Sequence, residues 1–467
     1  MSKARSVIVF LFPAILIIYF FATFIPNIVS WNSALESFFT SGTTKLIWRA
    51  AFAILYASYT VVAYFVLKPK INKPLLVFSL LAFFVLLLSP VFNLGEISFV
   101  YIDDFQRTIN YSIKIGILEI LSFYADTLFS LVFLLSLFTV LPILIRESKG
   151  HILLFYLFVS FMFFSCLLSY ILEADTYLLK IQGNSNAQLY GIASIFPSKN
   201  AFGAFLVQAI IISAFMLFRS LNTKTNRKRV FKSLMNITWA LLVAVFFVTL
   251  FFSFSKNGIG AAFVFAISVI VFFINRFFTK QKKTLPKKIR LVGLFILAIL
   301  VVGISFMLIN PTTRLAFIRA LEGRNDLAVY FFDNFKGEQI FLGFGHTLPH
   351  QAYKWSIIGH FNSIFTDVHN AYLTVLGMGG IIFFAFYVGL HLYAFRLINQ
   401  RKNNLMIYVV PSAALLAYAF WAFFESAQIF ISGSSASSLM SMLIVAIPLA
   451  YAVHSREEVI NLETDVG

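Results

Sequence analysis

The sequence contains a single cysteine and few charged residues, and both shortages narrow the classes of protein to which it can belong. Cys166 stands alone inside an apolar run, so the chain has neither a disulfide framework nor a thiolate metal site. Only 12% of the residues are charged, whereas 60% are hydrophobic and 18% are aromatic. No soluble domain of 467 residues has enough interior to bury that many apolar side chains, so the surrounding solvent is predicted to be lipid.

Sequence motifs for metals and nucleotides are missing as well. His346 and His350 lie four residues apart, but Leu348 and Pro349 between them disfavour a helix that would align both rings on a zinc ion. The chain has no phosphate-binding loop and no dinucleotide-binding fingerprint. We therefore expect no metal site and no cofactor.

Apolar runs of about 20 residues, separated by short polar connectors, predict an all-α polytopic membrane protein. The first run has no small-residue cleavage site after it, so it is interpreted as a membrane helix rather than a signal peptide. Residues 1–467 are expected to form one integral membrane domain with about twelve transmembrane helices. The predicted spans are residues 7–28, 46–67, 74–95, 124–145, 151–172, 201–218, 234–254, 258–275, 290–309, 370–395, 405–424 and 432–453.

The distribution of charge predicts how these helices are oriented. With both termini in the cytoplasm, 24 of the 36 lysines and arginines lie on the cytoplasmic side, but only 5 of the 19 acidic residues do. This bias agrees with the positive-inside rule. It also accounts for the net charge of +17 without nucleic acid, because the basic segments 219–232 and 276–290 each join two predicted spans.

Two segments on the opposite side are long enough to form structure of their own. Residues 96–124 alternate charged and apolar residues, which predicts an amphipathic helix on the membrane surface. Residues 310–367 form the longest polar stretch and contain aromatic residues throughout, which predicts a large folded extracytoplasmic loop between spans nine and ten. His369 follows this loop at the outer mouth of the tenth span, where a chemical function is expected.

Two further segments stand where predicted spans begin. The first is Gly191-Ile-Ala-Ser-Ile-Phe-Pro-Ser-Lys-Asn, and the second is Ser253-Phe-Ser-Lys-Asn-Gly-Ile-Gly. They resemble the glycine-to-asparagine segment and the serine-arginine-glycine turn of the O-antigen ligase and polysaccharide polymerase family. Lys256 stands where the family usually has arginine, which keeps the positive charge but loses the bidentate fork.

Two more landmarks follow in the order found in this family. Arg324 and the later Gly343-Phe-Gly segment resemble its loop arginine and Gly-x-Gly segment. The His369-Asn pair, followed by Gly380, resembles its histidine motif, although Phe383 stands where a second glycine is expected. The resemblance covers residues 191–383, and outside this core it reduces to the pattern of apolar runs.

The resemblance implies a fold of the kind shared by lipid-dependent glycosyltransferases, in the cytoplasmic membrane of a bacterium. The implied activity is a metal-independent glycosyl transfer with a diphosphate leaving group. It would polymerise polyprenyl-diphosphate-linked oligosaccharide repeat units into an O-antigen, capsule or exopolysaccharide. The implied partners are the lipid-linked oligosaccharide, membrane lipid, a chain-length regulator and a flippase, and no nucleic acid is expected.

The residues support this chemistry, because a transferase of this kind needs cations at the leaving diphosphate and a base for the attacking hydroxyl. Arg324 is the first candidate for the diphosphate, since a guanidinium can hold two phosphate oxygens. His369 is the second catalytic candidate, either as the base or as a protonated group that stabilises the leaving diphosphate. The alternatives are a solvated loop arginine and an interfacial histidine at a helix start.

Five other residues are candidates for binding the diphosphate or the sugar, and each also has a structural explanation. Lys256 and Lys199 could contact phosphate, or could extend from a helix end to the membrane surface. Asn200 could bind sugar or cap a helix, and Tyr372 could line the site or belong to the aromatic belt. Arg319 in the large loop is kept as a further candidate.

Three alternative functions remain open. The nearest is an O-antigen ligase, which would transfer the glycan to a lipid A core. A flippase or transporter of the lipid-linked glycan belongs to another class, but transporters tend to show paired repeats, and the long polar loop occurs only once. The last is a structural membrane partner without catalysis.

Overall fold

The structure is a computed structural model. It describes residues 3–25, 42–69, 73–92, 96–102, 108–114, 117–182, 192–196, 198–222, 229–280, 331–332, 335–344, 370–399, 405–425 and 436–452.

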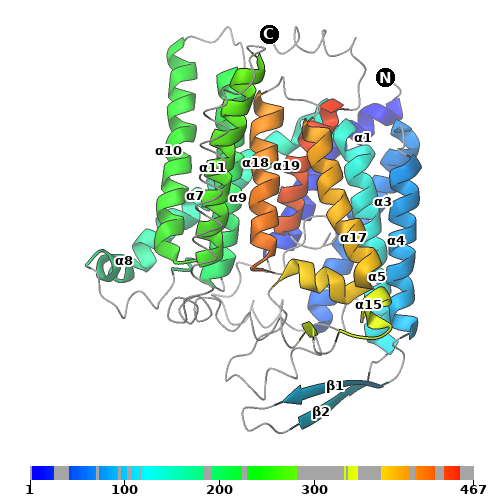
Figure 1. The fold of residues 1–467 in the computed structure, drawn as a ribbon. Helices are drawn as coiled ribbons and strands as arrows, with labels where there is room; N and C mark the ends of the chain where they lie inside the picture. Colours follow the sequence, from blue (N-terminus) through cyan, green and yellow to red (C-terminus); the bar gives the residue numbers. More distant parts are fainter. Residues whose placement is uncertain are drawn as a thin grey trace.

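Long helices stand side by side and form one bundle (Figure 1). Helix is the expected form for these apolar segments, because it satisfies the backbone hydrogen bonds of each segment without water. The bundle helices are α1 (Lys3–Phe24), α3 (Gly42–Leu67), α4 (Lys73–Phe92), α5 (Ile117–Phe138), α6 (Val140–Ser148), α7 (Gly150–Leu172), α9 (Lys199–Asn222), α10 (Arg229–Ser253), α11 (Lys256–Lys280), α17 (Ala371–Asn399), α18 (Leu405–Ala422) and α19 (Ala436–Ala452). The short elements are the helices α8 (Ala174–Ile181) and α15 (Gln339–Leu342) and the strands β1 (Glu96–Ile102) and β2 (Thr108–Lys114).

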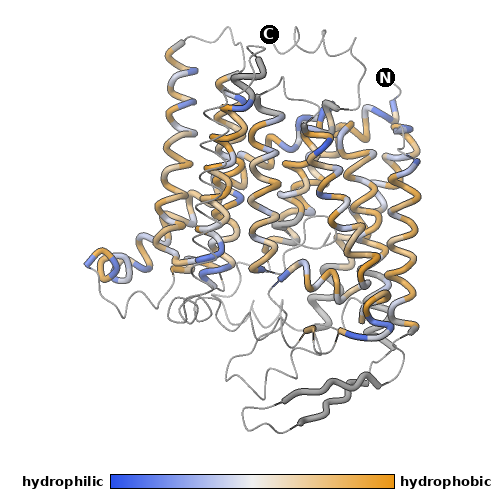
Figure 2. Tube along the Cα trace, viewed as in Figure 1, coloured by the Kyte–Doolittle hydropathy of each residue, from blue (hydrophilic) through white to orange (hydrophobic). Residues whose placement is uncertain are grey.

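The helices have the length and composition of membrane spans. Seven of the described helices are long and apolar enough to cross a membrane, and the bent pair α5–α6 would make an eighth span. Figure 2 shows hydrophobic residues along the middle of the bundle and hydrophilic residues toward both of its ends. The prediction of a polytopic helical membrane protein is therefore confirmed. The total of twelve spans stays a prediction, and the predicted span 290–309 lies outside the described residues, as does most of the predicted loop 310–367.

Helix α9 forms the centre of the bundle, and 78% of its most apolar segment is buried inside the protein. Inside this apolar core, Gln208 of α9 donates from Nε2 to Ser441 Oγ on α19 at 2.8 Å. Its Oε1 accepts a hydrogen bond from the Tyr418 hydroxyl on α18 at 2.7 Å. All three side chains are buried, so this network fixes how the three helices face one another.

The two ends of the bundle differ in charge. The N-terminus lies at the end opposite the β1–β2 hairpin (Figure 1), and we call these the terminal end and the hairpin end. At the terminal end, the charged side chains that the structure describes are basic except Glu147, which pairs with Arg5. The other basic residues at that end are Lys3, Lys68, Lys73, Arg146, Lys149, Arg219, Lys232 and Arg396. The described residues at the hairpin end are mixed, with Glu173, Asp175, Glu338 and Glu425 beside Lys180, Lys199, Lys256 and Lys336.

The segment after α4 is a β-hairpin, so the prediction of an amphipathic helix over 96–124 is wrong. β1 pairs antiparallel with β2 in a register that sets Glu96 opposite Lys114 and Ile102 opposite Thr108. Both strands are rich in β-branched and aromatic residues, which suit a pleated strand better than a helix. The helical part of the segment begins only at Ile117.

The predicted fourth span, 124–145, is also bent rather than continuous. Helices α5 and α6 meet at an angle of 54°. Thr139 between them has φ −125° and ψ −79°, outside the helical region. Pro142 follows three residues later, and its missing N–H and bulky ring oppose an uninterrupted helix through this point.

Candidate functional site

Helices α9 and α11 each begin at the hairpin end with a serine cap. Ser198 Oγ accepts a hydrogen bond from the backbone N–H of Ala201 at 3.1 Å. Ser255 Oγ accepts one from Gly258 N–H at 3.4 Å. These hydroxyl groups bond to amides that the first turn of a helix leaves without an internal partner, which explains why both helices start here.

Glycines allow these two first turns to touch. A Cβ on Gly203 would overlap the Ser255 side chain, and a Cβ on Gly258 would lie 3.3 Å from the Gly203 carbonyl oxygen. Lys199 is one helical turn before Gly203, and Lys256 directly follows Ser255. The two candidate lysines therefore stand on neighbouring turns, Lys256 exposed and Lys199 half-buried.

Glu425, just after α18, connects the start of α11 to the start of α17. Asn257 donates from Nδ2 to Glu425 Oε1 at 2.7 Å and to the Phe424 carbonyl oxygen at 3.3 Å. The backbone oxygen of Glu425 accepts a hydrogen bond from Ala371 N–H at 2.9 Å. Asn370 Oδ1 caps α17 by accepting from Leu373 N–H at 3.0 Å. The starts of α9, α11 and α17 are thus joined through direct contacts.

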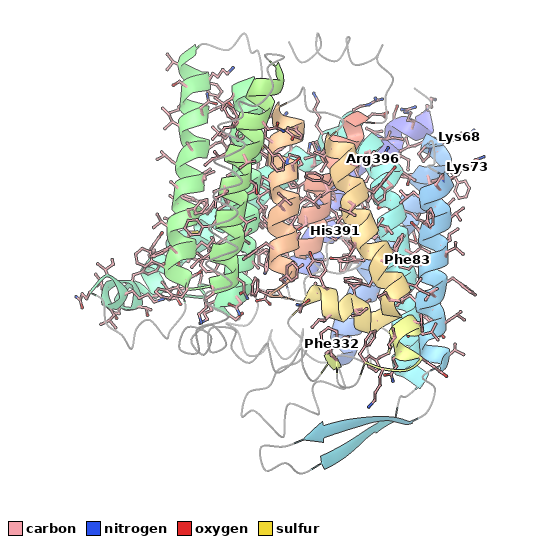
Figure 3. All side chains as sticks on the ribbon, in the orientation of Figure 1. Lys68, Lys73, Phe83, Phe332, His391 and Arg396 are labelled. Carbon is pink, nitrogen blue, oxygen red and sulfur yellow. The ribbon has the colours of Figure 1, made fainter. Side chains whose placement is uncertain are left out.

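Helix α17 is broken, although its sequence predicts a continuous span. Gly379 and Gly380 have non-helical backbone angles, and Gly380 has φ 66° and ψ −168°. The part before the break lies across the hairpin end, and the longer part runs along the bundle (Figure 1). Phe383, just after the break, is fully buried. It packs against Phe83 of α4 (labelled in Figure 3), with ring centroids 5.6 Å apart.

The short helix α15 packs backbone against backbone at this break. Gly343, at the end of α15, has φ 69° and ψ −170°. A Cβ added to it would lie 2.6 Å from the Gly377 carbonyl oxygen, and one added to Gly380 would overlap the Phe341 carbonyl group. Phe344 N–H donates to the Gly377 oxygen at 2.5 Å. Gly343 and Gly380, which belong to two different family-like segments, therefore both lie at the backbone contact between α15 and α17. We call this contact the α15–α17 joint.

The electrostatics of the site favour an anion. The first turns of α9, α11 and α17 all lie at the hairpin end, so the positive ends of three helix dipoles are found there. Lys256 and Lys199 add positive charge at two of these starts. Glu425 is the acidic residue that the structure describes between α11 and α17, and one of its carboxylate oxygens accepts the Asn257 bond. The arrangement can hold a phosphate-bearing ligand.

The sequence did not single out two charged residues, Glu173 and Lys180, that bond to the backbone near the starts of α9 and α11. Glu173, after α7, accepts hydrogen bonds from Ala193 N–H and Ser194 N–H at 3.2 and 3.1 Å. Lys180 Nζ in α8 donates to the Phe252 carbonyl oxygen at 2.8 Å. Burial, together with the charge of nearby Lys199, lowers the pKa of Lys180 to about 8, against the opposite effect of Glu173. The only sequence signal for either residue was its position in a polar connector between two spans.

Of the seven predicted site residues, four lie in the part of the chain that the structure describes and three lie outside it. Lys199, Asn200 and Lys256 lie in the first turns of α9 and α11. Tyr372 is in the first turn of α17, where its hydroxyl donates to the Ala419 carbonyl oxygen at 3.0 Å and its ring packs on Phe423 at 4.5 Å. The remaining three, Arg324, Arg319 and His369, lie outside the described residues.

Within the described parts of the chain, no three His, Cys, Asp or Glu side chains are grouped closely enough to hold a metal ion. The sequence matches no protein-family model and no curated protein at a significant level.

Proposed function

We propose that this protein is an integral membrane glycosyltransferase that polymerises polyprenyl-diphosphate-linked oligosaccharide repeat units into a surface polysaccharide. One observation carries the proposal. The starts of α9, α11 and α17, which belong to three of the four family-like segments, are joined at one end of the bundle by the Gly203–Ser255, Asn257–Glu425 and Ala371–Glu425 contacts. Segments that are far apart in the sequence therefore bring three helix starts and two lysines together at one end of the bundle, where an anion could bind.

The proposed site faces the outside of a bacterial cytoplasmic membrane. The basic side chains at the terminal end support this orientation, because positively charged connectors stay in the cytoplasm. The hairpin end, with its mixed charges, would then lie where lipid-linked glycans are assembled into polymers. The diphosphate of such a donor sits at the headgroup level while its polyprenyl chain stays in the bilayer, so a site at the helix ends matches the depth of the reacting bond.

The proposed reaction forms one glycosidic bond and breaks one. A hydroxyl oxygen of the acceptor unit attacks the anomeric carbon of the donor glycan, and the carbon–oxygen bond to the diphosphate breaks. The electron pair leaves with the diphosphate, and the hydroxyl proton passes to a base. Lys256, Lys199 and the helix dipoles would stabilise the leaving group, together with Arg324 of the predicted extracytoplasmic loop.

His369 precedes α17 by two residues and is assigned to one of two steps. As a neutral imidazole it would take the proton from the acceptor hydroxyl, which is favoured by the positive dipole of a helix start. As an imidazolium it would stabilise the departing diphosphate. The two roles predict opposite pH limbs: activity that requires a base rises with pH through the histidine pKa, and activity that requires the cation falls.

The test is a reconstituted transfer assay with purified protein and lipid-diphosphate repeat units. We expect a ladder of glycans from the wild type, and no ladder from Arg324→Ala or His369→Ala with unchanged thermal stability. Arg396→Ala, an exposed arginine at the terminal end, is the matched control and should leave the ladder intact.

Two other outcomes would contradict the proposal of a polymerase. Transfer of the glycan to an added lipid A core, without a ladder, would identify a ligase. Movement of the lipid-linked glycan across proteoliposomes without either product would identify a transporter.

A further inference from the structure

The short helix α8 contacts both of the turns that introduce the candidate lysines. It follows α7 at the hairpin end of the bundle (Figure 1). Glu173 stands immediately before α8, and Lys180 lies in its last turn. These two side chains carry opposite charges and reach different segments, Glu173 the one before α9 and Lys180 the one before α11.

Lys180 holds the turn between α10 and α11 in two ways. Its ammonium group donates to the carbonyl oxygen of Phe252, in the last turn of α10, where helix carbonyls have no internal partner. The same nitrogen lies 4.0 Å from the ring centroid of Phe254, close enough for a cation–π contact. Phe254 has φ +55°, a conformation that residues with side chains adopt rarely. Lys180 thus stabilises an unfavourable turn two residues before Lys256.

Glu173 holds the segment before α9 in a parallel way. Its two carboxylate oxygens accept from the consecutive amides of Ala193 and Ser194. Ser194 has φ +52°, again in the left-handed region, and its hydroxyl donates to the Ser165 carbonyl oxygen at 2.8 Å. The segment fixed in this way leads directly into the cap of α9 and into Lys199.

The position of Lys180 in the fold makes its positive charge costly. The residue is only 8% exposed, and the charged form of its side chain is disfavoured by Lys199 and favoured by Glu173. Burying a cation beside another cation costs stability unless its hydrogen bonds and an opposite charge offset the loss of water. The hydrogen bond to Phe252, the contact with the Phe254 ring and the charge of Glu173 offset part of that cost.

We propose that α8 braces the site: Lys180 and Glu173 are positioning residues that fix the turns before α11 and α9, and thereby place Lys256 and Lys199 for a diphosphate-bearing donor. This inference rests on the proposed function for the identity of the donor. The brace itself rests only on the contacts of α8 with the two turns.

The test compares Lys180→Met, Lys180→Arg and Glu173→Gln with the control Asp175→Asn, which removes an exposed charge from the same helix. Two quantities are measured on the full-length protein in detergent. One is amide hydrogen exchange over residues 192–203 and 253–260, and the other is the rate of glycosyl transfer against the concentration of lipid-diphosphate donor.

Lys180→Met should raise exchange over 253–260 and raise KM for the donor about tenfold, with a smaller change in kcat, because a hydrogen bond from a charged group is lost. Lys180→Arg should restore both values toward those of the wild type, since it keeps the charge and the donor. Glu173→Gln should act on 192–203 instead, and Asp175→Asn on neither segment.

Unchanged exchange in the turn of Lys180→Met would overturn the brace, and so would an equal rise in distant α19. A loosened turn with an unchanged KM would overturn the positioning role. If the wild type transfers no glycan while the exchange pattern appears as expected, the brace stands and the proposed function fails.

Discussion

Replacing Gly380 by alanine is predicted to detach α15 from the break in α17. Gly380 occupies a backbone region, φ 66° and ψ −168°, that is essentially restricted to glycine. The added methyl group would also overlap the carbonyl group of Phe341. Because the clash is with backbone atoms, no change of side-chain rotamer can relieve it, and one of the two segments has to move.

The size of the effect follows from these two costs. Holding a residue with a side chain in this backbone region costs about 1–3 kcal/mol. Forcing a methyl group into a packed contact costs about 1–3 kcal/mol more. The docking of α15 should therefore weaken by about 2–6 kcal/mol, and with 1.4 kcal/mol per factor of ten, exchange of the amides in 339–344 should accelerate by about 30-fold or more.

The assay is hydrogen exchange of residues 339–344 and 371–380 in purified protein, with two glycine controls. Gly389→Ala lies in the same helix with nothing within 4 Å of the new Cβ, so it should be neutral or slightly stabilising. Gly337→Ala has φ +63° but also nothing within 4 Å, so it reports the cost of backbone strain without a clash, about 1–2 kcal/mol. Exchange in Gly380→Ala that matched Gly389→Ala would refute the reasoning about the joint.

Three further outcomes are expected. Gln208→Met should lower the free energy of unfolding by about 1–3 kcal/mol in denaturant titrations, because it removes the amide that bonds the buried Tyr418 and Ser441 hydroxyls, and Gln208→Glu would be the harsher change. Asn257→Ala should lower the free energy of unfolding by about 1–2 kcal/mol, because the hydrogen bond to the Glu425 carboxylate is lost. Asn257→Asp should lower it more, because two carboxylates would then lie together, and thermal unfolding of the two variants will show the order. Donor affinity should fall as pH rises through about 8, where Lys180 loses its proton, and Lys180→Arg should remove that limb of the binding curve. The stability change has the opposite sign: the pKa of Lys180 lies below its ordinary 10.5, so the unfolded chain binds more protons between these values and unfolding becomes harder as pH rises.

The membrane part of the fold could be predicted from the sequence because lipid imposes a strong and local rule. An apolar segment without water must satisfy its own backbone, and helix is the form that does so within one segment. The predicted starts of the sixth, eighth and tenth spans, at residues 201, 258 and 370, lie within two residues of the helix starts at Lys199, Lys256 and Ala371. Serine and asparagine caps mark these starts in the sequence.

The hairpin and the break in α17 depend on information that hydropathy does not contain. In residues 96–114, charged and apolar residues are mixed in a way that fits either a surface helix or a strand. The β-branched and aromatic content favours the strand, but the prediction of a helix did not weigh it. At Gly379 and Gly380 the apolar run continues without a polar residue, so it reads as one span. At the break, α17 meets the backbone of α15, which lies more than thirty residues earlier in the chain, and hydropathy carries no sign of this contact.

The candidate site was predictable as a set of helix starts but not as a set of contacts. Lys256 and Lys199 could be identified because each is a cation at the edge of an apolar run. Lys180 and Glu173 could not, because a charge in a connector is usually solvated. Their importance comes from the backbone groups they reach, in the last turn of α10 and in the segment before α9. Long-range packing, rather than local pattern, makes these two residues part of the site.

The contacts also explain why such a site would be built from backbone as much as from side chains. A cation within the apolar layer is costly, so charge at the membrane is best supplied by helix dipoles and by lysines at helix ends. Helix starts can act together only if their backbones approach closely, which requires Gly203 and Gly258 between α9 and α11 and Gly343 and Gly380 at the α17 break. It follows that alanine at Gly203, which would overlap the Ser255 side chain, should weaken donor binding through the position of Lys256 without removing any charged group.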